Sequence, residues 1–254
     1  MWLSELFGTK KPVLGVVHLK PLPAAPLYQG SLEEVFNRAR DCAEALIKAG
    51  FHGVIFENFG DTPFLPDQVP PHVVGILSIL IREFSRRIPC GVNLLRNAAY
   101  QALGAAFAGG GSFIRVNIHI GAAVTDQGLV TGKAHNTLRY RAELGSSIKI
   151  LADISVKHSR PIASSDPLQE ALDCVERGLA DAVIVTGPRT ATPADLTVVR
   201  ALKENLPDVP VFVGSGVTAE TAARTLRIAD GIIVGTALEK KLGVIDPKKA
   251  EEFM

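Results

Sequence analysis

Short runs of β-branched and other apolar residues alternate along the chain with longer segments whose apolar positions recur at helical spacing. Ser31 followed by Glu34 is typical of a capping box that begins a helix, and Gly50 is placed to end the same helix. The apolar runs predict eight strands, at Val13–His18, Val54–Asn58, Gly91–Leu95, Phe113–Asn117, Lys149–Lys157, Ala182–Thr186, Val211–Gly214 and Gly231–Gly235. The segments between them predict helices at Leu32–Ala49, Val73–Arg87, Ala98–Ala108, Asn136–Leu144, Leu168–Arg177, Ala194–Asn205 and Ala219–Leu226.

This alternation predicts parallel strands, because a helix between two strands carries the chain back to start the next strand in the same direction. Eight strand–helix units in 254 residues favour a closed (β/α)8 barrel, and a doubly wound open sheet is the alternative. No Pro/Ser-rich linker divides the chain, so we expect a single domain over residues 1–254. Within it, residues 1–8 should form a short helix that plugs the barrel or packs on a neighbour, and residues 119–133 a lid loop.

Two glycine-containing turns follow the last two predicted strands, at Gly214-Ser215-Gly216 and at Gly235-Thr236. Glycine permits close backbone approach to a ligand, and N–H groups at the start of the next helix favour an anion. In a (β/α)8 barrel these loops are the usual phosphate site. The turns, together with Gly187 after the sixth strand, therefore predict phosphate binding; the alternative is that the glycines only make tight turns.

Polar side chains share one face of the fourth and fifth predicted strands, whereas the residues between them are apolar. Side chains alternate faces along a strand, so Arg115 and Asn117 should face the barrel interior, as should Asp153, Ser155 and Lys157. Buried charges are costly unless paired, so these positions predict either a wet functional mouth or an internal ion-pair network. Lys157 is a Schiff-base nucleophile in one interpretation; in the other it pairs with Asp153 or with the ligand's phosphate.

The other strand ends add polar groups to the same end of the barrel, where functional residues of this fold lie. We expect Lys157, Asp153, Glu57 and His18 to carry acid–base catalysis, with His18 either a proton carrier or a donor to a carbonyl group. A divalent-metal site from Glu57, Asp153 and His18 is an alternative, but the spacing carries no metal signature, and no cofactor is predicted. The side chains expected to contact substrate are Lys20, Asn58, Asn93, Arg96, Arg115, Asn117, Asp126, Gln127 and Thr186.

The amino-acid composition limits the classes of partner that we expect for the protein. The formal net charge is +1, so nothing indicates the basic surface of a nucleic-acid-binding protein. Hydrophobic residues make up 47% of the chain, but the apolar runs are short and broken by charge, so no transmembrane segment is predicted. Cys42, Cys90 and Cys174 form no CxxC pair and are interpreted as buried thiols of a cytoplasmic protein. A homo-oligomer is expected, because many barrels of this kind associate.

The strand-end motifs together resemble those of the BtpA/SgcQ family almost from one end of the chain to the other. Two positions depart from the family pattern: Ala98 stands where an acid is usual, and Ala191 where a glycine is usual. The segments that carry the resemblance are Gly15–Pro23, Val54–Phe64, Gly91–Asn97, Phe113–Asn117, Val124–Gly128, Ala152–His158, Val213–Thr218 and Ile233–Thr236.

The resemblance implies a barrel of the ribulose-phosphate-binding type. It also implies a role in photosystem I biogenesis as an extrinsic thylakoid protein, with peripheral membrane association, where the host is photosynthetic. The polar mouth favours instead an enzyme acting on a phosphorylated small molecule, either a sugar phosphate or a nucleotide-like metabolite. The two hypotheses are therefore a phosphometabolite isomerase, lyase or phosphoribosyl-type transferase, and a non-catalytic assembly or stabilisation factor for a membrane complex.

Overall fold

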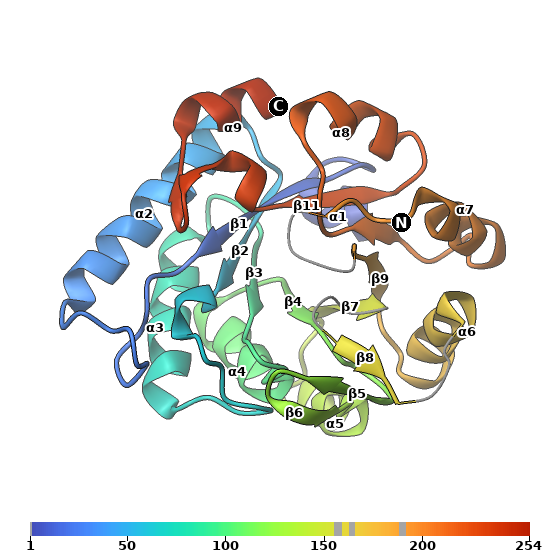
Figure 1. Ribbon diagram of the computed structural model, residues 1–254, viewed down its shortest axis with the longest axis horizontal. Helices are drawn as coiled ribbons and strands as arrows, with labels where there is room; N and C mark the ends of the chain where they lie inside the picture. The colour runs from blue at the N-terminus through green and yellow to red at the C-terminus, as the bar shows by residue number, and fades with distance from the viewer. Residues whose placement is uncertain (1, 155–158, 163–165, 188–191) are drawn as a thin grey trace.

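The computed structural model describes residues 2–154, 159–162, 166–187 and 192–254, and its strands form a closed parallel barrel (Figure 1). The ring closes because β1 pairs in parallel with both β2 and β11, which excludes the open-sheet alternative. The (β/α)8 prediction is thus confirmed. In their order around the barrel the strands are β1 (Val13–His18), β11 (Gly231–Val234), β10 (Val211–Val213), β9 (Ala182–Val185), β7 (Lys149–Ile154), β4 (Phe113–Val116), β3 (Cys90–Asn93) and β2 (Gly53–Glu57).

Helices surround the barrel, and the longest shows how local sequence defines an element. The Ser31 hydroxyl accepts the backbone N–H of Glu34 at 3.2 Å, and Gly50 ends the helix in the left-handed region at φ 89°. The helices are α1 (Trp2–Phe7), α2 (Leu32–Ala49), α3 (Pro71–Phe84), α4 (Ala99–Gly109), α5 (Ala134–Glu143), α6 (Pro167–Leu172), α7 (Leu196–Asn205), α8 (Ala219–Leu226) and α9 (Pro247–Phe253). A π-helical segment, η2 (Asp173–Arg177), continues α6, and the short 3-10 helices are η1 (Phe59–Asp61) and η3 (Thr236–Leu238). Among the described residues, none of the helices combines the length and apolarity that crossing a bilayer requires.

The amino-terminal end of the barrel is filled by apolar side chains and covered by α1. Phe7 of α1 meets the ring of Phe113 edge to face, with centroids 5.6 Å apart, inside a buried cluster that also contains Phe212. A Cβ at Gly91 would lie 2.2 Å from the Phe113 ring, so glycine makes room for the aromatic side chain on the neighbouring strand. This packing closes one end of the barrel and leaves the polar groups at the other.

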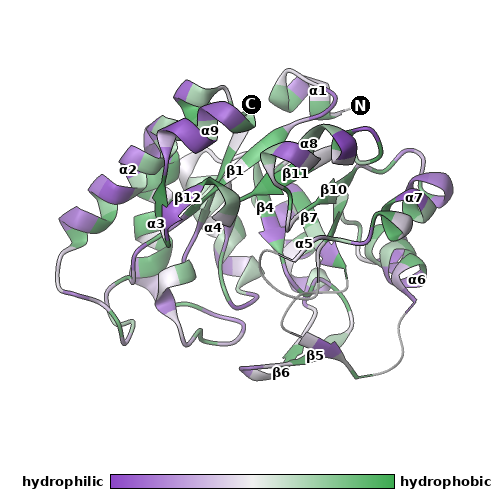
Figure 2. Ribbon diagram, turned by 45° about the horizontal axis from the view of Figure 1, so that its top comes forward, coloured by the Kyte–Doolittle hydropathy of each residue, from purple (hydrophilic) through white to green (hydrophobic). Residues whose placement is uncertain are grey.

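Two small sheets lie outside the barrel. β5 (Ala122–Thr125), β6 (Gly128–Thr131) and β8 (Ser159–Pro161) pair antiparallel in the order β6-β5-β8, and Figure 2 shows β5 and β6 set apart from the barrel strands. Much of the segment 119–133 is therefore a β-hairpin with Asp126 and Gln127 at its turn. The second sheet is the hairpin of β12 (Glu239–Lys241) and β13 (Val244–Ile245), which follows the last barrel strand.

Candidate functional site

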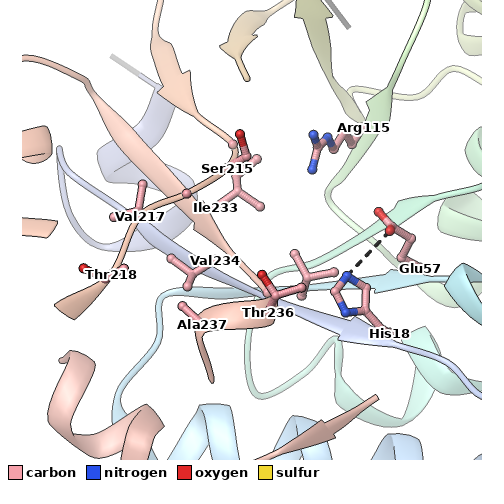
Figure 3. Close-up of a pocket in the computed structure, with 14 residues that line it drawn as sticks. His18, Glu57, Arg115, Ser215, Val217, Thr218, Ile233, Val234, Thr236 and Ala237 are labelled. Carbon is pink, nitrogen blue, oxygen red and sulfur yellow. Dashed lines mark ion pairs between the residues drawn. The ribbon is translucent and has the colours of Figure 1, made fainter. Parts of the chain in front are cut away.

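A cavity of about 230 Å³ lies at the carboxyl ends of the strands, between the two glycine turns and the side chains of β1, β2 and β4 (Figure 3). It brings together His18, Glu57 and Arg115 with both turns, although these segments are far apart in the sequence. The lining residues are Val16, His18, Glu57, Arg115, Gly214, Ser215, Gly216, Val217, Thr218, Ile233, Val234, Gly235, Thr236 and Ala237.

The glycines of both turns are required by packing within the protein. A Cβ at Gly235 would lie 2.8 Å from Cε1 of His18, so glycine there lets the imidazole ring reach its position. Gly216 has φ 66°, and a Cβ on it would lie 2.4 Å from the backbone nitrogen of Pro193. Tight packing by itself therefore accounts for glycine at these two positions, and ligand binding has to be argued from other groups.

Ser215 uses its hydroxyl group to join two loops. The hydroxyl accepts the N–H of Gly187 at 2.6 Å and donates to the carbonyl oxygen of Thr192 at 3.1 Å. Its only proton is therefore used in the hydrogen bond to Thr192, and the hydroxyl cannot donate to a phosphate at the same time. Within the described residues, the backbone N–H groups of Gly216 and Val217 and the hydroxyl of Thr236 have no hydrogen-bond partner, so these donors remain for an anion.

Arg115 supplies a positive charge on one side of the cavity. Its Nε and Nη2 bind Oδ1 and Oδ2 of Asp153 at 3.0 and 3.1 Å, and Asn117 donates to Oδ2 of the same carboxylate at 2.8 Å. Nη1 has no partner among the described residues, and Figure 3 shows the guanidinium directed into the space between Ser215 and Glu57. Burial lowers the pKa of Arg115, but the carboxylates of Asp153 and Glu57 outweigh it and hold the pKa above its ordinary value. One of the two alternatives, an internal ion pair, is thus present between Arg115 and Asp153, and it holds a cation beside the glycine turns.

His18 lies on the opposite side of the cavity, between two carboxylates. Its Nδ1 is 2.8 Å from Oε1 of Glu239, and its Nε2 is 3.7 Å from Oε1 of Glu57 (Figure 3, dashed line). The other oxygen of Glu57 accepts the side-chain amide of Asn93 at 2.6 Å, and the ring of Phe59 packs against the imidazole with centroids 4.6 Å apart. The sequence predicted His18, Glu57 and Asn93 but not Glu239, which lies in the second outer hairpin.

Two of the predicted substrate contacts belong to other parts of the molecule. Asn58 donates to the carbonyl oxygen of Leu95 and accepts its N–H, at 3.1 and 2.7 Å, so it ties the loops after β2 and β3 together. Lys20 pairs with Glu34 of α2 at 2.6 Å. Neither side chain lines the cavity.

Arg96 is buried near the barrel mouth, where it interacts electrostatically with Asp126 of the β5–β6 hairpin. Burial lowers the pKa of Arg96, and the carboxylates of Asp126, Asp153 and Glu57 oppose that change. The interaction with Asp126 means that the turn of the β5–β6 hairpin lies within electrostatic reach of the mouth. Gln127 donates to the Asp126 carboxylate at 2.5 Å, so the two predicted lid residues contact each other.

The remaining predicted residues are buried at strand ends or lie outside the described residues. Oδ1 of Asn93, Oδ1 of Asn117 and the hydroxyl oxygen of Thr186 are buried without a hydrogen-bond partner in the described part of the chain. Lys157 falls in segment 155–158, outside the described residues, so its predicted catalytic role stays a prediction. Among the residues that are described, no group of three His, Cys, Asp or Glu side chains is arranged to hold a metal ion.

The closed barrel, with its polar cavity at the carboxyl ends of the strands, defines the class: a TIM barrel, or (β/α)8 barrel. A solved structure described as "Native KDPGal structure" superposes with a TM-score of 0.60 at 17% identity, covering 98% of this chain and 95% of that one. N-(5'-phosphoribosyl)anthranilate isomerase from Pyrococcus furiosus superposes with a TM-score of 0.57 at 18% identity, covering 95% and 96%. At these identities the similarity shows the fold alone.

The chain belongs to the BtpA family, whose model matches residues 9–254. It is 40% identical over 259 residues to Photosystem I biogenesis protein BtpA of Synechocystis sp., covering 100% of this chain and 90% of the relative. An uncharacterized protein of Pyrococcus furiosus is 41% identical over 252 residues, covering 98% and 94%. An uncharacterized mitochondrial protein of Caenorhabditis elegans is 31% identical over 245 residues, covering 92% and 87%. These matches confirm the family resemblance found in the strand-end motifs.

Proposed function

We propose that the protein binds a phosphorylated small molecule in the cavity of Figure 3 and catalyses proton transfer on it. The observation that carries this proposal is Arg115, a 3% exposed cation whose guanidinium group points into the cavity beside the two glycine turns. A guanidinium held by one carboxylate and directed at free backbone donors is suited to bind an oxyanion. The N–H groups of Gly216 and Val217, together with the Thr236 hydroxyl, supply further donors on the other side of the same space.

In this proposal His18 and Glu57 move the proton. Both line the cavity, and both are held by a neighbour, His18 by Glu239 and Glu57 by Asn93. Asp153 has a different role from the catalytic one predicted for it. Both of its oxygens accept hydrogen bonds, so it positions Arg115 and is not free to take up a proton from a ligand.

The size of the cavity favours a small ligand. Pockets for drug-sized molecules and cofactors run from ~300 to 1,000 Å³, whereas this cavity has about 230 Å³. A sugar phosphate suits that volume better than a nucleotide-like metabolite does. Aldose–ketose isomerisation of a sugar phosphate begins with removal of a proton next to the carbonyl group, which a histidine–carboxylate pair is suited to do.

The distribution of relatives also supports a metabolic role. Relatives that match most of the chain occur in Pyrococcus furiosus and in Caenorhabditis elegans as well as in Synechocystis sp.. A ligand that all of these proteins bind would be a metabolite that their organisms have in common. The second candidate function, an assembly factor for a membrane complex, is supported by the 40% identity to the Synechocystis protein.

Binding can be tested by thermal unfolding in the presence of inorganic phosphate and a panel of sugar phosphates. A ligand at 100 times its Kd stabilises the folded state by about 2.7 kcal/mol, which for a chain of this size raises the midpoint by roughly 5–11 °C. We expect a sugar phosphate to produce such a shift, and Thr236→Asp to remove it, because a carboxylate there repels the phosphate. Thr9→Asp is the matched control: Thr9 follows α1, and its hydroxyl accepts the N–H of Lys11, a bond that an aspartate can keep.

Two results would contradict the proposal. One is a wild-type protein whose midpoint no member of the panel shifts. The other is a Thr236→Asp variant that responds to the same ligand as strongly as the wild type and the Thr9→Asp control do. Either result would leave the assembly-factor hypothesis as the better account of the family.

A further inference from the structure

The hydrogen bond between His18 and Glu239 determines which ring nitrogen of His18 carries the proton. Oε1 of Glu239 accepts the backbone N–H of Gly243 at 3.0 Å, and the same oxygen is 2.8 Å from Nδ1 of His18. A carboxylate only accepts hydrogen bonds, so Nδ1 of the neutral imidazole must be the donor. Nε2 is then the unprotonated nitrogen. It faces Glu57 at 3.7 Å and has no hydrogen-bond partner among the described residues.

Glu239 is held in place by groups other than His18. Lys249 of α9 donates to its backbone carbonyl oxygen at 2.7 Å, and Gly243 turns the β12–β13 hairpin back so that its own N–H meets the Glu239 carboxylate. Gly243 has φ 68°, and a Cβ on it would lie 2.9 Å from the carbonyl oxygen of His18. The hairpin can therefore lie directly against β1, and the carboxylate is placed before any ligand arrives.

In the described part of the chain, the charged groups around His18 are Glu239 on one side, Glu57 on the other, and Arg115 across the cavity. All three side chains are at least nine-tenths buried, as is His18 itself. When Nε2 accepts a proton, the positive charge that forms on the ring lies between two carboxylates. Arg115, across the cavity, is the cation that binds the phosphate group of the ligand in the proposed function.

We propose that Glu239 is a positioning residue that holds His18 as the Nδ1–H tautomer, so that Nε2 is the proton acceptor of the site. The inference rests on the proposed function. In the step that it serves, the C–H bond next to the ligand's carbonyl group breaks and the proton passes to Nε2. The electron pair of that bond stays on the ligand as an enolate. The substrate class is thus a phosphorylated carbonyl compound with a removable proton beside the carbonyl carbon.

The tautomer can be read by nitrogen-15 NMR of the imidazole groups, without any ligand, at a pH where the ring is neutral. His18→Asn identifies the His18 resonances by their disappearance. In the wild type we expect Nδ1 to show an N–H resonance and Nε2 the resonance of an unprotonated nitrogen. Glu239→Ala should turn this nearly complete Nδ1–H population into a majority of Nε2–H, the form that free imidazole side chains prefer.

Glu239→Gln is the conservative variant, and Glu252→Ala, on the exposed surface of α9, is the control. The glutamine oxygen can still accept both N–H groups, so we expect Glu239→Gln and the control to keep the Nδ1–H form. A wild type with Nε2–H, or a folded Glu239→Ala variant with an unchanged tautomer ratio, would overturn the proposal. If Glu239→Ala does not fold, the wild-type spectrum and Glu239→Gln still decide it. Because no ligand is used, failure here is separate from failure of phosphate binding.

Discussion

Replacing Arg115 with methionine tests the ion pair on which the candidate site is built. The side chains of Arg115 and Asp153 are 3% and 0% exposed and are joined by two hydrogen bonds. Removing the guanidinium leaves a buried carboxylate whose one remaining side-chain donor among the described residues is Asn117. The structure therefore predicts a large loss of stability, because an unpaired buried charge has neither water nor a counter-ion to solvate it.

The expected magnitude follows from burial. Breaking a buried ion pair by removing one partner costs about 3–5 kcal/mol, a large part of the ~5–15 kcal/mol that keeps a typical domain folded. Arg40 and Glu83 form a comparable pair at 2.9 and 3.0 Å, but these side chains are 41% and 37% exposed. Exposed pairs contribute roughly 0.2–1 kcal/mol, so Arg40→Met is the matched control and should change stability far less.

Urea unfolding of the wild type, of Arg115→Met, of Asp153→Leu and of the double variant supplies the free energies of unfolding. The double variant replaces the whole pair by apolar groups and should recover most of the loss, because no unpaired charge remains. The reasoning is refuted if Arg115→Met costs no more than Arg40→Met does, or if the double variant is as unstable as the worse single variant.

Two further predictions concern buried titratable groups. Burial lowers the pKa of His119 below its ordinary 6.5, so at a pH just below that value the unfolded chain binds a proton that the folded chain does not, and stability falls as the pH drops. His119→Gln can still donate to the carbonyl oxygen of Gly178, and in urea titrations it should reduce the loss of stability between about pH 7.5 and 5. The exposed control His135→Gln should lose as much stability as the wild type does. An equal loss in the two variants would contradict the prediction. Burial also raises the pKa of Cys90 and Cys174 to about 12. Neither thiol should therefore be labelled by a thiol reagent at about pH 8 until the protein unfolds, which mass spectrometry of the native protein checks.

The barrel was predictable because the information for it is local. Alternating apolar runs and helical spacing are properties of neighbouring residues, and the predicted strand Val13–His18 has the same bounds in the structure. The β5–β6 hairpin was expected only as a lid loop, although its sequence contains features that are typical of a β-hairpin. The segment Thr125–Gly128 forms a tight turn with a glycine at φ 90°, between two short runs with β-branched residues that pair as β5 and β6.

What the sequence by itself determined is the class of fold and the end of the barrel at which the polar side chains gather, because strand periodicity decides which face each residue occupies. Only the tertiary structure decided the partners of those side chains. Glu239 meets His18 across 221 positions of the chain, and the Ser215 hydroxyl is used by a neighbouring loop and is not free to donate to a phosphate. Hydrogen bonds depend on the placement of distant segments to within a few tenths of an ångström, and no local pattern in the sequence encodes that distance.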